Sequence, residues 1–260
     1  DPDGASILLA TGRARHDLLV VAEPVFLRDL DQAWGRPSAR VRLSFLPGVE
    51  APSAPGHEDA LMSYERGGLG VLVARGRTSV YEGEAARSAT ALARIASGAR
   101  LRAALLVTRA TPLRGSGDVA GGSAPGQVRV VADHLNLSGG SLFPAPGMVS
   151  AGWDATLTER LGSLRGVSGS SVVALVPGPL RPSPAESRAL VSLGADAAVT
   201  DSVAEAMILA ARGVAVSALT YLDAPAAGGN LGRAQLSLRQ ASGVTLAAVE
   251  EILRSLRAGS

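Results

Sequence analysis

The stretch VVALVPGPLRPSPAESRALVSLGADAAVTD, residues 172–201, decides the fold class of this chain. Its first five residues form a continuous apolar run that ends at Pro177, which is typical of a strand covered on both faces. Ser183 precedes Pro184, and Glu186 follows three residues after the serine. This pattern is a capping box with proline at the first helical position, so it predicts the start of a helix.

The same stretch predicts where that helix ends and which strand follows it. The helix should run from Pro184 to about Leu193 and end at Gly194, since glycine readily terminates helices. The apolar residues 197–199 then form a second strand, and polar residues follow directly. Ligands bind at the carboxyl ends of strands in open α/β sheets, so Asp201 lies where a site is expected.

Strand and helix patterns alternate along the rest of the 260 residues, which indicates an α/β fold around a largely parallel or mixed sheet. No internal repeat divides the chain, and we expect a single domain spanning residues 1–260. A glycine-, serine- and proline-rich stretch at residues 111–125 predicts a long loop, of the kind that is functional or disordered. Predicted strands are Ser6–Ala10, Gly70–Arg75, Ala103–Val107, Val128–Ala132 and Val214–Thr220, and predicted helices are Glu84–Ser97, Trp153–Leu164, Ala204–Arg212 and Thr245–Ala258.

Composition narrows the possible partners and cofactors. The chain has no cysteine and only three histidines without metal-ligand spacing, so we expect no metal site and no cofactor. The formal net charge is +2 and the arginines form no basic cluster, which argues against a nucleic-acid partner. No apolar run reaches the length of about 18 residues that a membrane span requires. The chain begins without a signal-like apolar region, so the cytoplasm is the expected location.

Polar groups follow three of the predicted strands. Thr11 and a glycine follow the first strand, where backbone N–H groups could bind an anion or simply form a turn. Arg77 lies close to two hydroxyl residues, and its planar fork of donors suits phosphate, although a surface arginine in a turn is the alternative. The segment Asp133–Asn136 reads DHLN, and we favour a structural network over a catalytic role.

Four motifs follow one another along the chain: PGH at 55–57, GRxxxYEG at 76–83, DHLNLSG at 133–139 and GPxxxxPAExRxLxxLGADA at 178–197. In this order they resemble the trimeric purine nucleoside phosphorylases, and the resemblance covers nearly the whole chain. The family fold is a mixed sheet, partly closed as a barrel and flanked by helices, and its three subunits share their active sites. The family reaction is reversible phosphorolysis of purine nucleosides, so an active member would be a pentosyltransferase.

On the phosphate side, the resemblance implies a weakened site. Arg77 and His57 match the family, whereas Asp201 stands where a serine hydroxyl binds phosphate. A carboxylate repels a phosphate dianion by roughly 4 kcal/mol for each pair of unit charges about 4 Å apart at an effective dielectric near 20. The phosphate-site equivalents are Thr11, His57, Arg77, Ser79 and Asp201, in which Thr11 replaces a serine of a glycine-rich turn and Ser79 replaces a second histidine.

On the sugar and base side, the resemblance implies that the groups reading the purine are missing. Pro182 replaces a glutamate that accepts hydrogen bonds from the base, and Ala224 replaces an asparagine that stabilises the leaving purine. One such donor contributes roughly 3 to 4 kcal/mol to catalysis. The sugar- and base-site equivalents are Tyr81, which matches a tyrosine near the ribose, with Ala110, Arg181, Pro182, Thr200, Asp223 and Ala224.

Three functions remain open from the sequence. The first is a phosphorylase homologue with a degenerate site, either a pseudoenzyme or a protein recruited to a different ligand or reaction. The second is active phosphorolysis or hydrolysis of a nucleoside with unusual specificity. The third is a structural subunit of a mixed trimer with an intact paralogue, although a homotrimer is the expected assembly. The first predicts a charged pocket mouth made by Arg77, Arg109, Arg181, Asp201 and Asp223.

Overall fold

The computed structural model describes residues 2–79, 82, 85–113, 124–139, 152–178, 181–223 and 231–259. Strands and helices alternate along the described chain, as the sequence predicts. The strands are β1 (Leu18–Val21), β2 (Ala39–Val41), β3 (Leu61–Arg66), β4 (Leu69–Ala74), β5 (Ala103–Pro112), β6 (Val128–Asn136), β7 (Val167–Leu175), β8 (Ala197–Val199) and β9 (Ala215–Leu222). The helices are α1 (Pro2–Thr11), α2 (Arg28–Trp34), α3 (Ala86–Ala89), α4 (Ala91–Ser97), α5 (Ala155–Gly162), α6 (Pro184–Ser192), α7 (Val203–Ala211) and α8 (Leu231–Ala258), with short 3-10 turns at Pro24–Phe26 (η1) and Leu43–Phe45 (η2).

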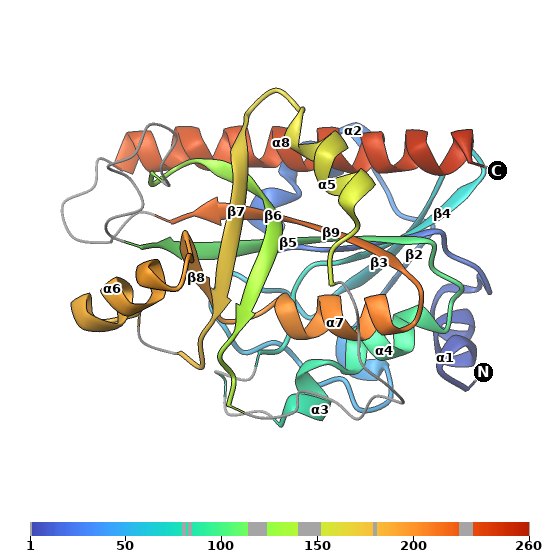
Figure 1. Ribbon diagram of the computed structural model, residues 1–260. Coiled ribbons are helices and arrows are strands. Elements are labelled where there is room, and N and C mark those ends of the chain that lie inside the picture. The colour runs from blue at the N-terminus through green and yellow to red at the C-terminus, as the bar shows by residue number, and fades with distance from the viewer. Residues whose placement is uncertain are drawn as a thin grey trace.

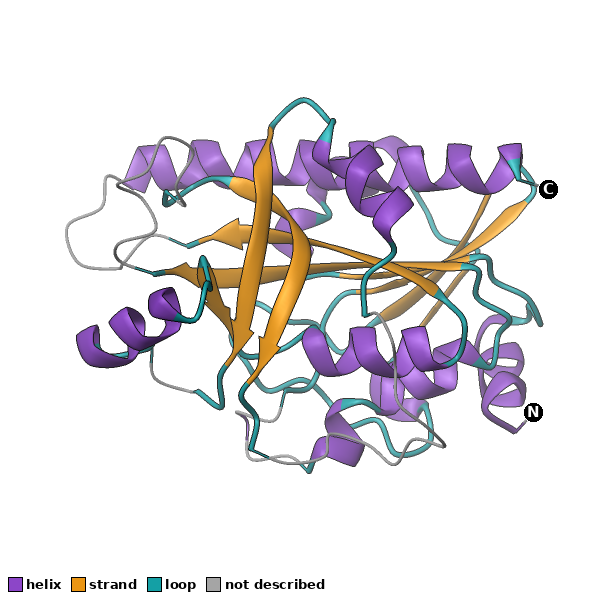
Figure 2. Cartoon of the chain, viewed as in Figure 1, coloured by secondary structure: helices purple, strands orange, loops and turns teal. Residues whose placement is uncertain are grey.

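All these strands belong to one mixed sheet. Its order is β2-β3-β4-β1-β5-β8-β7-β6-β9, and an additional pairing of β5 with β9 closes the last five strands into a ring. β1 runs parallel to both β4 and β5, whereas β5 and β8 are antiparallel. Figure 2 shows β6 and β7 crossing the long strands β5 and β9 steeply, as closure requires. The predicted mixed sheet, partly closed as a barrel, is confirmed.

Helices cover both faces of this sheet. The long helix α8 runs along one face together with α2 and α5, and α4 and α7 lie against the other (Figure 1). Leu105 and Ile252 belong to the apolar core beneath α8, while Leu106, Ile95 and Leu209 belong to the core on the opposite side. Successive residues of β5 thus point into opposite cores, which is why the strand reads as a continuous apolar run.

The unit formed by residues 172–201 is confirmed as strand, helix and strand. The Ser183 hydroxyl accepts a hydrogen bond from the backbone N–H of Glu186 at 3.2 Å, and the Glu186 carboxylate accepts one from the backbone N–H of Ser183 at 2.7 Å. This capping box starts α6 at Pro184, as the sequence predicts. β7 and β8 then pair in parallel, with Val173 opposite Ala197.

The prediction of a strand at Ser6–Ala10 is wrong. These residues belong to α1, whose Ile7 is fully buried in the core that also holds α4. At Gly4 an added Cβ would lie 2.3 Å from the carbonyl oxygen of Gly98, so the glycine permits close contact with the end of α4. A short apolar run does not distinguish a strand from a buried helix turn. The first strand is instead β1.

Several predicted boundaries also change. β6 continues through Asn136, so the DHLN segment lies within a strand and not after one. The helix predicted at residues 84–97 is two helices, α3 and α4, separated at Thr90. The terminal helix begins at Leu231, 14 residues before its predicted start at 245. In the predicted loop at 111–125, residues 114–123 lie outside the described part. None of the helices in the described ranges combines the length and apolarity needed to cross a membrane.

Candidate functional site

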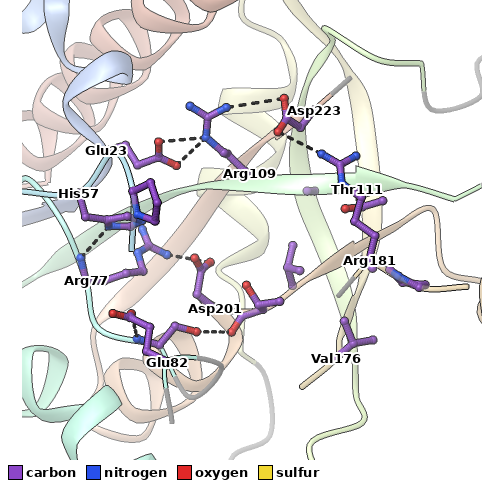
Figure 3. A pocket seen from close by; sticks show the side chains of 17 residues that line it. Glu23, His57, Arg77, Glu82, Arg109, Thr111, Val176, Arg181, Asp201 and Asp223 are labelled. Atoms are coloured by element: carbon purple, nitrogen blue, oxygen red, sulfur yellow. Dashed lines mark hydrogen bonds and ion pairs between the residues drawn. The ribbon is translucent and has the colours of Figure 1, made fainter. Parts of the chain in front are cut away.

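A cavity of about 320 Å³ lies at the ends of several strands (Figure 3). Polar side chains reach it from segments that follow β1, β4, β7, β8 and β9, and from the end of β5 itself. This is the edge of the sheet where ligands of α/β proteins bind. The residues that the sequence analysis singled out and that line this cavity are His57, Arg77, Ser79, Arg109, Ala110, Arg181, Pro182, Thr200, Asp201 and Asp223.

Three other candidate residues remain, and the structure describes one of them. Thr11 ends α1 and donates its hydroxyl hydrogen to the backbone oxygen of Ile7 at 2.7 Å, and it does not line the pocket. The prediction of an anion-binding turn at Thr11 depended on the strand wrongly placed at residues 6–10. Tyr81 and Ala224 lie outside the described residues.

Arg77 is the most enclosed charge of the pocket. Its side chain is 2% exposed, and its Nη1 lies 3.1 Å from both a carboxylate oxygen of Asp201 and one of Glu205. Its Nη2 donates to the backbone oxygens of Val21 at 2.9 Å and Val107 at 2.8 Å. Burial opposes the charge, yet Asp201 and Glu205 raise the pKa of Arg77 above its ordinary value. The guanidinium is therefore engaged by the protein itself.

Asp201 reaches Arg77 from the turn between β8 and α7. The following residue, Ser202, has a φ of 66°, a left-handed conformation that few residues other than glycine adopt. The same Asp201 oxygen that meets Arg77 also accepts a hydrogen bond from the Thr108 hydroxyl. A carboxylate of the protein thus occupies donors that an anionic ligand would need.

Glu205 lies behind this pair in the first turn of α7. Its side chain is 5% exposed, and its Oε2 lacks a hydrogen bond within the described structure, although it is within ion-pair distance of Arg77. Burial, reinforced by the neighbouring Asp201 charge, raises the pKa of Glu205 to about 7, and Arg77 opposes that shift. Glu205 therefore changes charge near neutral pH.

The remaining phosphate-site candidates also make internal hydrogen bonds. His57 Nδ1 accepts the backbone N–H of Arg77 at 3.1 Å, and burial together with Arg77 lowers the pKa of His57. A neutral His57 with an unprotonated Nδ1 must carry its hydrogen on Nε2. The Ser79 hydroxyl donates to the backbone oxygen of Thr200 at 2.7 Å. Both side chains line the pocket, but their strongest donors or acceptors face the protein.

Glu82, another carboxylate of the pocket, is surrounded by hydrogen-bond donors. Its oxygens accept hydrogen bonds from the backbone N–H groups of Ser79 at 2.7 Å, Ser53 at 2.8 Å and Ala54 at 3.2 Å, and from the Ser53 hydroxyl at 2.6 Å. Burial works against ionisation, yet these hydrogen bonds lower the pKa of Glu82. Glu82 thereby ties the segment after β4 to the loop at 53–54.

A separate cluster of charged side chains surrounds Arg109 at the mouth of the pocket. Its Nε lies 2.8 and 2.9 Å from the two carboxylate oxygens of Glu23, and its Nη1 lies 3.6 Å from Asp223. Arg181 Nη2 lies 3.5 Å from the other oxygen of Asp223. Figure 3 shows Asp223 between the two arginines. The guanidinium of Arg109 also lies 5.4 Å from the ring centroid of Phe26.

Sequence reasoning missed Glu23. It lies two residues after β1, in the turn after the first strand, whereas the sequence predicted that turn at Thr11. The apolar run LLVV at residues 18–21, ended by Glu23 and Pro24, is the signal that could have located it. The charged residues lining the cavity are three arginines and four carboxylates, so their formal sum is +3 − 4 = −1 with His57 neutral.

The DHLN segment lies away from this cavity. His134 Nδ1 accepts a hydrogen bond from the indole N–H of Trp153 at 3.1 Å, and the two rings meet edge to face. Asp133 is exposed and accepts a hydrogen bond from the backbone N–H of His134. These contacts join β6 to the segment before α5, and they favour the structural interpretation of the DHLN segment.

Comparisons with known proteins agree with this architecture. No family model matches the chain. The purine nucleoside phosphorylases of Mycobacterium tuberculosis and Mycobacterium bovis are each 33% identical over 242 residues, covering 90% of this chain and 87% of theirs. A crystal structure of isoform 2 of purine nucleoside phosphorylase from Schistosoma mansoni, in complex with cytosine and ribose-1-phosphate, superposes with a TM-score of 0.76 at 18% identity. That superposition covers 96% of this chain and 93% of the other. The chain belongs to the purine nucleoside phosphorylase family.

Proposed function

We propose that this chain is a family member that does not carry out phosphorolysis, either a pseudoenzyme or a protein recruited to a different ligand or reaction. The observation that carries this proposal is the contact of the Asp201 carboxylate with Arg77 and Thr108. Phosphate could reach Arg77 only by displacing Asp201 and then lying beside it. That repulsion costs roughly 4 kcal/mol for each pair of unit charges about 4 Å apart, and a dianion incurs it twice.

The base side of the pocket supports the same proposal. Pro182 lines the cavity where the family resemblance expects a glutamate, and proline supplies no side-chain hydrogen bond to a purine. Arg181 replaces the expected aromatic residue and pairs with Asp223. A neutral purine does not require this pair of opposite charges.

The direct test is turnover of inosine or guanosine in the presence of phosphate. We expect no release of purine base above the uncatalysed rate. A turnover on the order of 1 to 1000 per second, which is typical of enzymes, would refute the proposal. Such a result would establish the alternative of an active nucleoside phosphorylase or hydrolase with unusual specificity.

Phosphate binding gives an independent test with a designed variant. A ligand present at 100 times its Kd stabilises a protein by about 2.7 kcal/mol, so binding is visible as a thermal shift. We expect no phosphate-dependent shift in the natural chain and a measurable one in Asp201→Ser, which removes the competing carboxylate. Glu65→Gln is the matched control, because it removes an exposed carboxylate that pairs with Arg13 outside this pocket. A clear shift in the natural chain would contradict the proposal.

For the assembly, we propose a homotrimer in the cytoplasm, on the basis of the family resemblance. Light scattering should give three times the chain mass of 26.2 kDa. A mixed trimer with an intact paralogue is the remaining alternative. Mass measurement after co-expression with neighbouring genes distinguishes it, since a mixed trimer has a different total mass.

A further inference from the structure

The contacts of Asp223 with its two arginines are longer than strong ion pairs. Its oxygens lie 3.6 Å from Arg109 Nη1 and 3.5 Å from Arg181 Nη2. A charge-assisted N–H···O hydrogen bond is normally about 2.7 to 2.9 Å long. One carboxylate therefore serves two guanidinium groups without a close contact to either, and both retain donors that a ligand could engage.

These arginines and Asp223, which is 32% exposed, are more accessible than the charges deeper in the pocket. The side chains of Arg109 and Arg181 are 35% and 44% exposed, whereas Glu23 is 8% exposed and Arg77 is 2% exposed. Glu23 holds Arg109 through its Nε, and Phe26 lies beneath the guanidinium, so this fork is fixed before any ligand arrives. Such preorganisation reduces the entropic cost of binding.

Arg181 is held less firmly than Arg109. Among the described residues, its ion-pair partner is Asp223. It follows β7 by six residues and precedes the capping box of α6, so it reaches the pocket from the opposite side to Arg109 (Figure 3). An anion placed between the two arginines would meet both guanidinium groups and would compete with Asp223, while Glu23 stays on Arg109 Nε.

Size and charge narrow the chemistry of that anion. A volume of about 320 Å³ lies at the lower end of the roughly 300 to 1,000 Å³ typical of ligand pockets, which suits a single ring. Ala110, Val176 and Pro182 give apolar wall on which a ring can pack. The formal lining charge of −1 disfavours a dianion more than a monoanion, and the planar guanidinium fork matches a carboxylate.

We propose that Arg109 and Arg181 bind the carboxylate of a small ring-sized acid at the pocket mouth, and that this carboxylate displaces Asp223 from them. The inference deepens the proposed function, on which it rests, by giving a ligand class to a pocket that has lost its phosphate and purine groups. It moves the anion site from the enclosed Arg77 to the exposed mouth.

Pyridine-3-carboxylate and its amide are suitable probes, because they share ring and size but differ in charge. Calorimetric titration without phosphate should show the acid binding at least tenfold more tightly than the amide. In Arg181→Gln the acid should lose about tenfold or more in affinity, since one hydrogen bond to a charged group contributes roughly 1.5 to 3 kcal/mol. In Asp223→Asn the acid should gain severalfold, while the amide stays unchanged, because a competing charge is removed.

Two further variants test whether the affinity for the acid depends on the guanidinium of Arg181 specifically. Arg181→Lys keeps the charge but loses the fork, so an intermediate affinity for the acid is expected. Arg160→Gln removes a half-exposed arginine paired with Glu251 elsewhere and should leave acid binding unchanged. Each variant is first shown to melt at the temperature of the natural chain.

Equal affinities for acid and amide would overturn the inference, as would no binding of either probe or an unchanged acid affinity in Arg181→Gln. A fall in acid affinity in Asp223→Asn would overturn the competition with Asp223. The nucleoside turnover assay decides the proposed function separately, because it measures purine release with phosphate present. If purine is not released and the acid and the amide bind equally well, this inference is refuted but the proposed function is not.

Discussion

Replacing Arg77 with methionine should destabilise the protein strongly. The change keeps a long side chain of similar volume but removes the guanidinium that faces Asp201 and Glu205, each at 3.1 Å. Both acids stay in place with side chains that are 16% and 5% exposed. Breaking a buried ion pair by removing one partner costs about 3 to 5 kcal/mol, because the other charge is left uncompensated.

The loss in Arg77→Met should also depend on pH. Burial already raises the pKa of Glu205 to about 7, and the Arg77 charge opposes that rise more than the backbone hydrogen bond from Ser202 does. Without Arg77 the folded-state pKa of Glu205 rises further above its unfolded value, so the folded protein holds a proton that the unfolded chain releases. Stability associated with that proton is present at low pH and is lost as pH rises through the folded pKa. The deficit should therefore be larger at pH 8 than at pH 6.

Urea unfolding at both pH values measures this effect. Arg77→Met alone should lower the free energy of unfolding by about 3 to 5 kcal/mol at pH 8. Adding Glu205→Gln should recover part of that loss, because a buried glutamine needs neither an ion-pair partner nor a bound proton to be neutral. A loss below about 1 kcal/mol, or an equal loss with and without Glu205→Gln, would show that the cluster does not stabilise the fold through charge pairing. Arg160→Met is the control for loss of an exposed arginine.

Three further predictions concern single positions. Burial lowers the pKa of His16 from 6.5 to about 4. The neutral histidine therefore contributes its full stabilisation above pH 6.5, and up to about 3 kcal/mol of the free energy of unfolding is lost as the pH falls to 4. Replacing it in His16→Gln should reduce this loss of stability at acid pH, as measured by urea unfolding. The raised pKa of Glu205 acts in the opposite direction, because stability is lost as the pH rises from about 4.5 to 7. The variant Glu205→Gln should not show this loss, and an unchanged dependence of the free energy of unfolding on pH would refute the raised pKa. Ser183→Ala removes the side-chain acceptor of the capping box and should cost about 1 kcal/mol in urea unfolding, whereas Ser192→Ala on the same helix should cost less.

Local sequence was sufficient for most secondary structure. The capping box at Ser183 and Glu186 and the apolar runs around it depend on residues within a few positions of one another, and both were placed correctly. The prediction for residues 6–10 was wrong because it also used local sequence alone, and their apolar run fits a strand or a buried helix turn equally well. Only the packing of Ile7 in the core decides between them. Because the first strand was predicted at residues 6–10, the turn after it was predicted at Thr11 and not at Glu23.

The sequence by itself therefore determined the α/β class and the family. It also placed Arg77, Arg109, Arg181, Asp201 and Asp223 near one pocket, and these five do line the same cavity. What only the tertiary structure decided is which charges pair. Asp201 meets Arg77 across 124 positions of sequence, and Glu23 meets Arg109 across 86. Ion pairing depends on distances of a few ångströms between side chains, and only the closed sheet sets those distances for segments so far apart along the chain.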